Sequence, residues 1–147
     1  MTTETTRVPN LGMGRTVPIH RTPLLRWALA VDGAVSAVNG LIYVALAAAV
    51  GGLLGLPATL LVPVGAFLIL YGAGLAVMSG RSRLRALAVL AVVELNAIWV
   101  VASLVVAATG WFDPSTIGVV WIVLQAAVVA GFAVAQLAGL RRARAGA

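Results

Sequence analysis

The sequence predicts an all-α fold, a four-helix transmembrane bundle with both termini on the cytoplasmic side (N-in/C-in). Three observations support this prediction: 62% of the 147 residues are hydrophobic, only 10% are charged, and the mean hydropathy is +1.09. In a soluble domain about a quarter of the residues are charged. Because no soluble core of this length hides so much apolar surface, we expect lipid to be the solvent for most of a single domain.

Four segments are long enough to cross a bilayer, which takes about 20 mostly apolar residues. The predicted spans are residues 24–53, 58–79, 84–109 and 115–140, within a membrane domain of residues 23–140. Pro23 precedes the first span, and stretches rich in Gly, Ser or Pro separate the spans. Residues 1–22 are polar and predict a flexible cytoplasmic tail, and residues 141–147 predict a basic cytoplasmic tail.

Arginine sets the predicted orientation. All ten Lys or Arg positions hold arginine, and each lies before the first span, between the second and third, or after the fourth. The positive-inside rule makes that side cytoplasmic. The absence of lysine, with Ala, Val, Leu and Gly dominant, is typical of a high-GC bacterial genome, so we expect a multi-pass protein of the bacterial cytoplasmic (inner) membrane. The residues expected to form an aromatic belt at the span boundaries are Trp27, Trp111, Phe112 and Trp121.

Small residues recur at helical spacing and predict close packing of the helices. In lipid, helices associate through small residues that let their backbones approach. These residues have two interpretations, packing inside the bundle or an interface between copies of the chain. The predicted packing residues are Gly33 and Ala37 on the first span, Gly72 and Ala76 on the second, and Ala127, Gly131 and Ala135 on the fourth.

Polar side chains inside the spans are the candidate functional residues, because ionisable groups in a membrane usually have a role. On the first span Asp32, Ser36, Asn39 and Tyr43 fall at i, i+4, i+7 and i+11, which places them on one polar face of a helix. On the fourth span Gln125 and Gln136 share a face with two aromatic residues, and on the third Asn96 shares one with Ser103, while Glu94 points about 200° away from Asn96. The candidate intramembrane polar or proton site comprises Asp32, Ser36, Asn39, Tyr43, Glu94, Asn96, Gln125 and Gln136.

Depth places some of these residues in one layer. Counted from the nearest arginine at about 1.5 Å per residue, Asp32, Glu94 and Gln136 lie about 7–14 Å into the cytoplasmic half. Two roles are open for Asp32 and Glu94. They can be structural, bonding to neighbouring polar groups to set helix register, or functional, as proton or cation sites.

Several kinds of chemistry lack the residues they need. The chain has no cysteine and a single histidine, His20, which lies in the predicted tail. The membrane segments therefore hold no nucleophile–base pair and no ligand set for a metal or haem. No glycine-rich phosphate loop is present, and topology accounts for the net charge of +6 without nucleic acid. We expect no enzyme activity, no cofactor and no metal.

Short motifs give a resemblance over most of the chain. They are "VDGAVSAVNG" (Val31–Gly40), "GLP" (Gly55–Pro57), "ELNAIWVVASLV" (Glu94–Val105), "TIG" (Thr116–Gly118) and "QLAGLRR" (Gln136–Arg142). With these, the chain resembles uncharacterised short four-span bacterial integral membrane proteins, which implies no activity. In size and span number it is also similar to small multidrug-resistance transporters. Those carry an essential glutamate in the first span, where this chain has Asp32, and its own Glu94 is in the third.

Two functional hypotheses follow. The first is a non-enzymatic integral membrane protein, an interaction or accessory subunit with a second copy or another membrane protein as partner besides the lipid bilayer. The alternative is a small proton- or cation-coupled transporter or channel that uses Asp32 and Glu94. The two differ in whether the polar faces surround a water-accessible cavity or bond one another in a dry interior.

Overall fold

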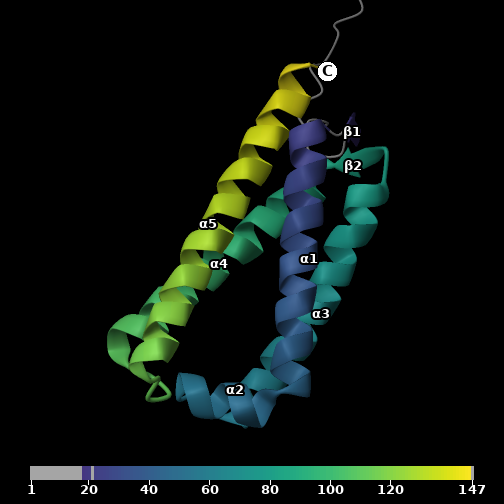
Figure 1. Cartoon of the computed structure of the whole chain (residues 1–147). Helices are drawn as coiled ribbons and strands as arrows, with labels where there is room; N and C mark the ends of the chain where they lie inside the picture. The colour runs from purple at the N-terminus through teal and green to yellow at the C-terminus, as the bar shows by residue number, and fades with distance from the viewer. Residues whose placement is uncertain (1–17, 21, 147) are drawn as a thin grey trace, which may run out of the picture.

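The computed structural model describes residues 18–20 and 22–146, and they form an almost wholly helical chain (Figure 1). Four long helices carry most of the residues, with one short helix and a two-stranded sheet between them. In chain order the elements are β1 (Pro18–His20), α1 (Pro23–Ala45), α2 (Ala47–Leu54), α3 (Ala58–Gly80), β2 (Arg83–Arg85), α4 (Ala86–Thr109) and α5 (Thr116–Ala145).

The four long helices, α1, α3, α4 and α5, are each long and apolar enough to cross a membrane. Each has 23 to 30 residues, so each extends at least about 34 Å at 1.5 Å per residue, against a hydrocarbon core of about 30 Å. The prediction of an all-α bundle with four spans is confirmed, and the chain is a multi-pass membrane protein.

The first predicted span is wrong in its length. Instead of one helix over residues 24–53, the backbone leaves helical geometry at Leu46 (φ −122°, ψ 27°). The eight-residue α2 then runs across the lower end of the bundle in Figure 1. A continuous helix of 30 residues would extend about 45 Å, well beyond the hydrocarbon core. The bend lets the surplus apolar residues lie across the end of the bundle.

The helices associate as two pairs. α1 packs along α3, α4 packs along α5, and α1 and α5 join the pairs. Figure 1 shows α1 and α5 close at the upper end and diverging towards α2. At the upper end the Thr22 hydroxyl donates to the Gly139 carbonyl (3.3 Å), and at the lower end the Ser115 hydroxyl donates to the Leu53 carbonyl (2.8 Å). In the middle of the bundle, the two helix pairs are joined by hydrogen bonds between side chains.

Glycines bring α1 and α3 into backbone contact, which confirms the predicted packing at Gly33, Ala37 and Gly72. The backbone of Ala76 lies beside Gly33, but Ala76 itself is exposed. A Cβ added at Gly33 would lie 3.0 Å from the Gly72 carbonyl oxygen, and one at Gly72 would lie 2.9 Å from the Ala37 Cβ. About two helical turns further along, Gly40 and Gly65 face each other in the same way, a contact that we did not predict. The four glycines of this contact have no room for a larger side chain.

For Ala127 and Gly131 in the predicted ridge on α5, the interpretation as packing inside the bundle is wrong, whereas the interpretation as an interface between copies stays a prediction. Both residues are exposed, and nothing lies within 4 Å of a Cβ built at Gly131; Ala135 is partly buried. A spacing of four residues drifts by about 40° per step on an α-helix. The ridge therefore turns outwards along its length. The buried small residues of α5 are instead Gly118, Ala126, Gly139 and Ala143.

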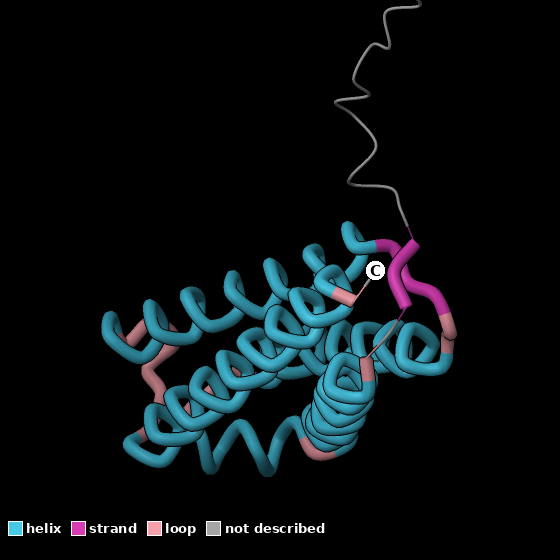
Figure 2. The backbone as a smooth tube through the Cα atoms, turned by 90° about the horizontal axis from the view of Figure 1, so that it is seen from above, coloured by secondary structure: helices cyan, strands magenta, loops and turns pink. Residues whose placement is uncertain are grey.

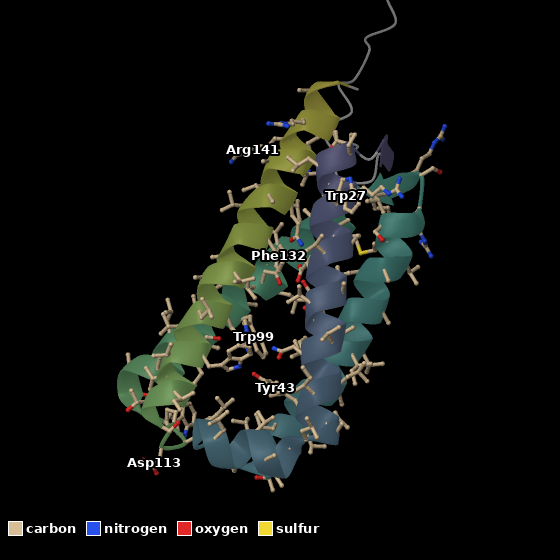
Figure 3. All side chains as sticks on the ribbon, in the orientation of Figure 1. Trp27, Tyr43, Trp99, Asp113, Phe132 and Arg141 are labelled. Carbon is tan, nitrogen blue, oxygen red and sulfur yellow. The ribbon has the colours of Figure 1, made fainter. Side chains whose placement is uncertain are left out.

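The two ends of the bundle differ in charge. The first turns of α1, the segment from the end of α3 through strand β2 and the last turns of α5 lie together near the C-terminus (Figure 2), and they carry every arginine that the structure describes; Asp113 lies at the opposite end (Figure 3). Parts of the predicted tails are ordered, since β1 pairs antiparallel with β2, Ile19 opposite Leu84, and α5 continues to Ala145. Residues 1–17, which include the rest of that tail, lie outside the described residues.

Three of the four predicted belt aromatics lie at the ends of the bundle. Trp27 is 66% exposed in the second turn of α1, and Trp111 stacks on Phe112 between α4 and α5, with ring centroids 5.3 Å apart. Trp121 is the exception. It points into the bundle, where the Tyr43 hydroxyl accepts a hydrogen bond from its indole nitrogen.

Packing predicts opposite results for two glycines. We expect Gly72→Leu to destabilise the protein strongly, because α1 and α3 must separate to admit the side chain. We expect Gly131→Leu, the matched control, to leave stability unchanged or slightly raised, because its Cβ meets open space and glycine is a poor helix former. Thermal unfolding in detergent measures both. Equal sensitivity of the two variants would contradict the helix arrangement.

Candidate functional site

Asp32 is the centre of a polar network inside the bundle. Its side chain is 1% exposed, although α1 is otherwise mostly apolar. Asp32 Oδ2 accepts hydrogen bonds from Gln136 Nε2 at 2.7 Å and from Asn96 Nδ2 at 3.0 Å, and Oδ1 accepts one from the Ser36 hydroxyl at 3.3 Å. The carboxylate thus joins α1 to α4 and α5.

Asn96 closes the network into a ring. Its Nδ2 also donates to Gln136 Oε1 at 3.1 Å, so Asp32, Asn96 and Gln136 each bond to the other two. Its Oδ1 accepts from the Tyr71 hydroxyl at 2.8 Å, which brings in α3. That hydroxyl also lies 3.3 Å from Asp32 Oδ2. A hydroxyl has one proton to donate, so the shorter bond makes Asn96 its main acceptor.

All four spans therefore meet at one carboxylate. Within the described part of the chain, no buried side-chain nitrogen or oxygen lacks a hydrogen-bond partner. An unsatisfied polar group in hydrocarbon costs several kcal/mol, so a network that satisfies all its members favours one arrangement of the helices. We call Asp32, Ser36, Tyr71, Asn96 and Gln136 the Asp32 network.

A second polar contact joins α1 to α5 towards the other end. The Tyr43 hydroxyl accepts from Gln125 Nε2 at 2.6 Å and from Trp121 Nε1 at 2.8 Å. Tyr43 is 5% exposed and packs in an apolar cluster with buried leucines of α2 and α3, including Leu54 and Leu61. The predicted polar face of α1 thus bonds to the predicted polar face of α5 at two levels.

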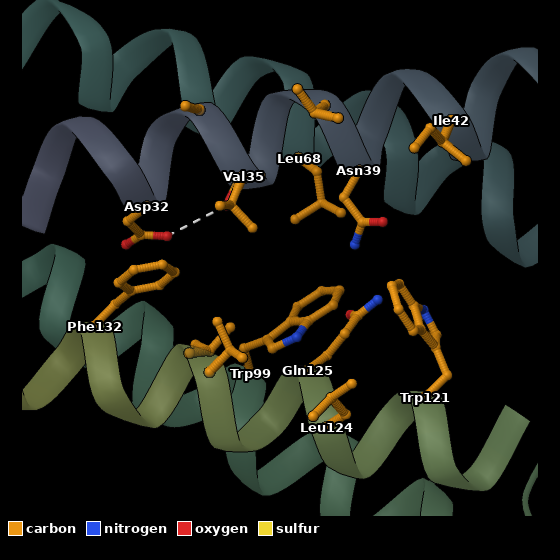
Figure 4. A pocket seen from close by; sticks show the side chains of 15 residues that line it. Asp32, Val35, Asn39, Ile42, Leu68, Trp99, Trp121, Leu124, Gln125 and Phe132 are labelled. Atoms are coloured by element: carbon orange, nitrogen blue, oxygen red, sulfur yellow. Dashed lines mark hydrogen bonds between the residues drawn. The ribbon is translucent and has the colours of Figure 1, made fainter.

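Between these two levels α1 and α5 enclose a cavity of about 460 Å³ (Figure 4), which we call the lateral cavity. Its walls are mostly apolar, with Trp99 of α4 and Trp121 and Phe132 of α5 among them. Asn39 projects from α1 towards Gln125 and Trp99. Among the residues that the structure describes, the Asn39 amide has no hydrogen-bond partner.

Glu94 does not join the other candidates. Its side chain is exposed on the outward face of α4, and it makes no hydrogen bond or ion pair with the described residues. The helical offset from Asn96 places it on the far side of α4 from the network. The hypothesis that Asp32 and Glu94 share one site is therefore wrong. Ser103 lines a smaller cavity of about 200 Å³ with Tyr43 and Gln125.

Sequence reasoning missed two residues of the site. Tyr71 completes the Asp32 network, and Trp99 forms a wall of the lateral cavity. Tyr71 had a signal in the sequence, since Pro63, Phe67 and Tyr71 recur every four residues, and the Phe67 and Tyr71 rings do stack, 6.0 Å apart. Trp99 lies three residues from Asn96, one helical turn along the same face.

The arrangement offers hydrogen bonding and shape but few reactive groups. The described residues contain no group of three His, Cys, Asp or Glu side chains that could hold a metal ion. Asp32 is surrounded by neutral donors and is covered by Ser36, Tyr71, Asn96 and Gln136. Comparison of this chain with protein families, with curated proteins and with solved structures finds no match.

The Asp32 network predicts different effects for two substitutions. We expect Asp32→Leu to destabilise the bundle by about 1–3 kcal/mol for each buried donor left without an acceptor. We expect Asp32→Asn to assemble, since its oxygen can replace Oδ2 and its amide can donate to the Ser36 oxygen. Unfolding free energies in detergent micelles measure both changes. A leucine variant as stable as the asparagine variant would show that the network does not hold the spans together.

Proposed function

We propose that the protein is a non-enzymatic subunit of the bacterial cytoplasmic membrane that acts by association within the bilayer, and that the outward face of α4 is where a second copy binds. The observation that carries this proposal is the exposure of Glu94. The residue lies nine positions beyond Arg85, about 13 Å along the helix and near the middle of the hydrocarbon core. An acidic residue at that depth costs about 2.5–3.5 kcal/mol on insertion scales and usually pairs with another group.

A second copy supplies a suitable partner. In its acid form a glutamate side chain both donates and accepts a hydrogen bond, and two-fold symmetry sets the same residue on both sides of an interface. Two Glu94 carboxyl groups can then bond to each other at equal depth. The surrounding face of α4 is apolar, with Leu87, Ala91, Ile98 and Val101 all exposed at helical spacing around Glu94.

The alternative, a transporter that passes protons or cations between Asp32 and Glu94, has less support. The two carboxylates lie on opposite sides of the α4 backbone, one sealed inside the bundle and one facing out. The donors around Asp32 close it off, so the network favours a fixed structural role for this residue. Transport through the pair would need α4 to rotate.

Sidedness follows from arginine. Under the positive-inside rule, the end of the bundle that holds β2 and the last turns of α5 is cytoplasmic. Reporter fusions after Arg83 and after Arg144 should then read as cytoplasmic, and fusions at Leu54 and at Asp113 as external. A cytoplasmic reading at Asp113 would contradict the proposed orientation.

Association through Glu94 can be tested by disulfide cross-linking, because the chain has no cysteine of its own. A cysteine introduced at Ile98, one turn from Glu94, should cross-link two copies in native-like membranes. Glu94→Leu should weaken dimerisation about three- to twenty-fold, the range that interhelical hydrogen bonds of about 0.6–1.7 kcal/mol give. Glu94→Gln, whose amide also donates and accepts, should retain it.

The control is a cysteine at Val134, which is 69% exposed on the outward face of α5. It should cross-link much less than the cysteine at Ile98. Equal cross-linking at both positions, or a monomer by sedimentation in detergent whatever residue is at 94, would contradict the proposal.

A further inference from the structure

The lateral cavity combines an apolar body with polar groups that the fold leaves unused. The Asn39 amide bonds to no described residue. Gln125 uses its Nε2 on Tyr43, and its Oε1 accepts no hydrogen bond from the described residues. Trp99 Nε1 likewise donates to none of them. Polar groups in hydrocarbon normally find a partner, because each unsatisfied one is costly, so these three side chains mark a place where the partner comes from outside the chain.

The cavity opens sideways, between α1 and α5. The side chains at its edge are apolar and exposed on the outer surface, including Val35 and Val38 of α1 and Leu124 and Val128 of α5. This part of both helices lies within the predicted hydrocarbon region. A molecule therefore enters from the bilayer and not from water. At about 460 Å³ the cavity falls in the range of pockets that hold small molecules.

The polar groups select the head of that molecule. Asn39 offers two N–H donors and a carbonyl, Trp99 an N–H donor, and Gln125 a carbonyl. A hydroxyl or carbonyl group satisfies such a set without carrying charge. Asp32 lies at one end of the cavity, but it is 1% exposed and its carboxylate oxygens already accept bonds from Ser36, Asn96 and Gln136. It is a poor counter-ion for a cation in the cavity.

We propose that the lateral cavity binds a neutral amphiphile from the bilayer, with a hydroxyl- or carbonyl-bearing head at Asn39 and Gln125 and its apolar part along Trp99, Trp121 and Phe132. This site goes beyond the α4 interface. It uses a different surface, so either proposal can fail while the other stands.

Asn39 gives the proposal an unusual signature. Leucine has the same number of side-chain heavy atoms as asparagine and branches at the same carbon, although it is larger, and it neither donates nor accepts a hydrogen bond. Since the Asn39 amide bonds to none of the described residues, we expect Asn39→Leu to fold normally and to be at least as stable as the parent without ligand. If the Asn39 amide made a hydrogen bond within the fold, the leucine variant would be less stable than the parent.

The test uses a monoacylglycerol with a dibrominated acyl chain, because bromine quenches tryptophan on contact. The protein carries Trp27→Phe and Trp111→Phe, which remove two tryptophans outside the cavity and leave Trp99 and Trp121 as reporters. We expect saturable quenching in detergent micelles, and an affinity at least tenfold lower in Asn39→Leu. Leu41→Ala, on the exposed side of α1, is the matched control and should bind as the parent does.

Three results would overturn the proposal. Quenching that does not saturate means that the probe only partitions into the micelle. Equal affinity in the parent and in Asn39→Leu means that the polar groups do not recognise the head. Tighter binding of the same brominated chain with a trimethylammonium head means that the cavity selects cations and that the neutral assignment is wrong.

Discussion

The hydrogen bonds of the Asp32 carboxylate are the interaction on which this bundle depends. Glycine contacts hold α1 to α3, but no comparable backbone contact holds that pair to α4 and α5 in the middle of the membrane. Lipid is as apolar as a leucine side chain, so apolar surface alone gives the two pairs little reason to associate. Asp32 supplies a hydrogen-bond acceptor to Asn96 of α4 and Gln136 of α5. The surrounding lipid hydrocarbon offers these two donors no other acceptor. These hydrogen bonds explain why the apolar helix α1 contains an aspartate.

The same constraint shapes the rest of the interior. With the pairs fixed at the Asp32 network and again at Tyr43, α1 and α5 remain apart between these two levels, and the lateral cavity is the space left. The two acids of the spans thus have opposite surroundings. Asp32 is satisfied within the chain, whereas Glu94 has no hydrogen-bond or ion-pair partner among the residues that the structure describes. That contrast is why we assign an internal structural role to the first and an intermolecular role to the second.

Helical periodicity predicted much of the site. Because residues three, four and seven apart share a face, the sequence placed Asp32, Ser36 and Tyr43 together and paired Gln125 with Gln136, and the structure confirms that these two faces meet. The same arithmetic set Glu94 about 200° from Asn96. The sequence could not tell which of these two faced inwards, since that depends on how α4 rotates against α5.

The errors of the sequence predictions also arise where the outcome depends on how the helices pack. Ala127 and Gly131 do not pack inside the bundle because a four-residue repeat drifts around a helix, so only the last members of the ridge stay between the helices. The break at Leu46 carries no proline or glycine and could not be read from local sequence. Tyr71 was overlooked because a single tyrosine in an apolar helix looks like a packing residue until its partners on other helices are known.

The most direct test of the central claim is a double-mutant cycle on Asp32→Ala and Gln136→Ala, with unfolding free energies measured in the same bilayer mimic. If the carboxylate holds α1 to α5, the loss in the double variant will be smaller than the sum of the two single losses. The coupling energy should be about 0.5–2 kcal/mol. Strictly additive losses would contradict the account, because they would mean that the two side chains contribute independently of the bond between them.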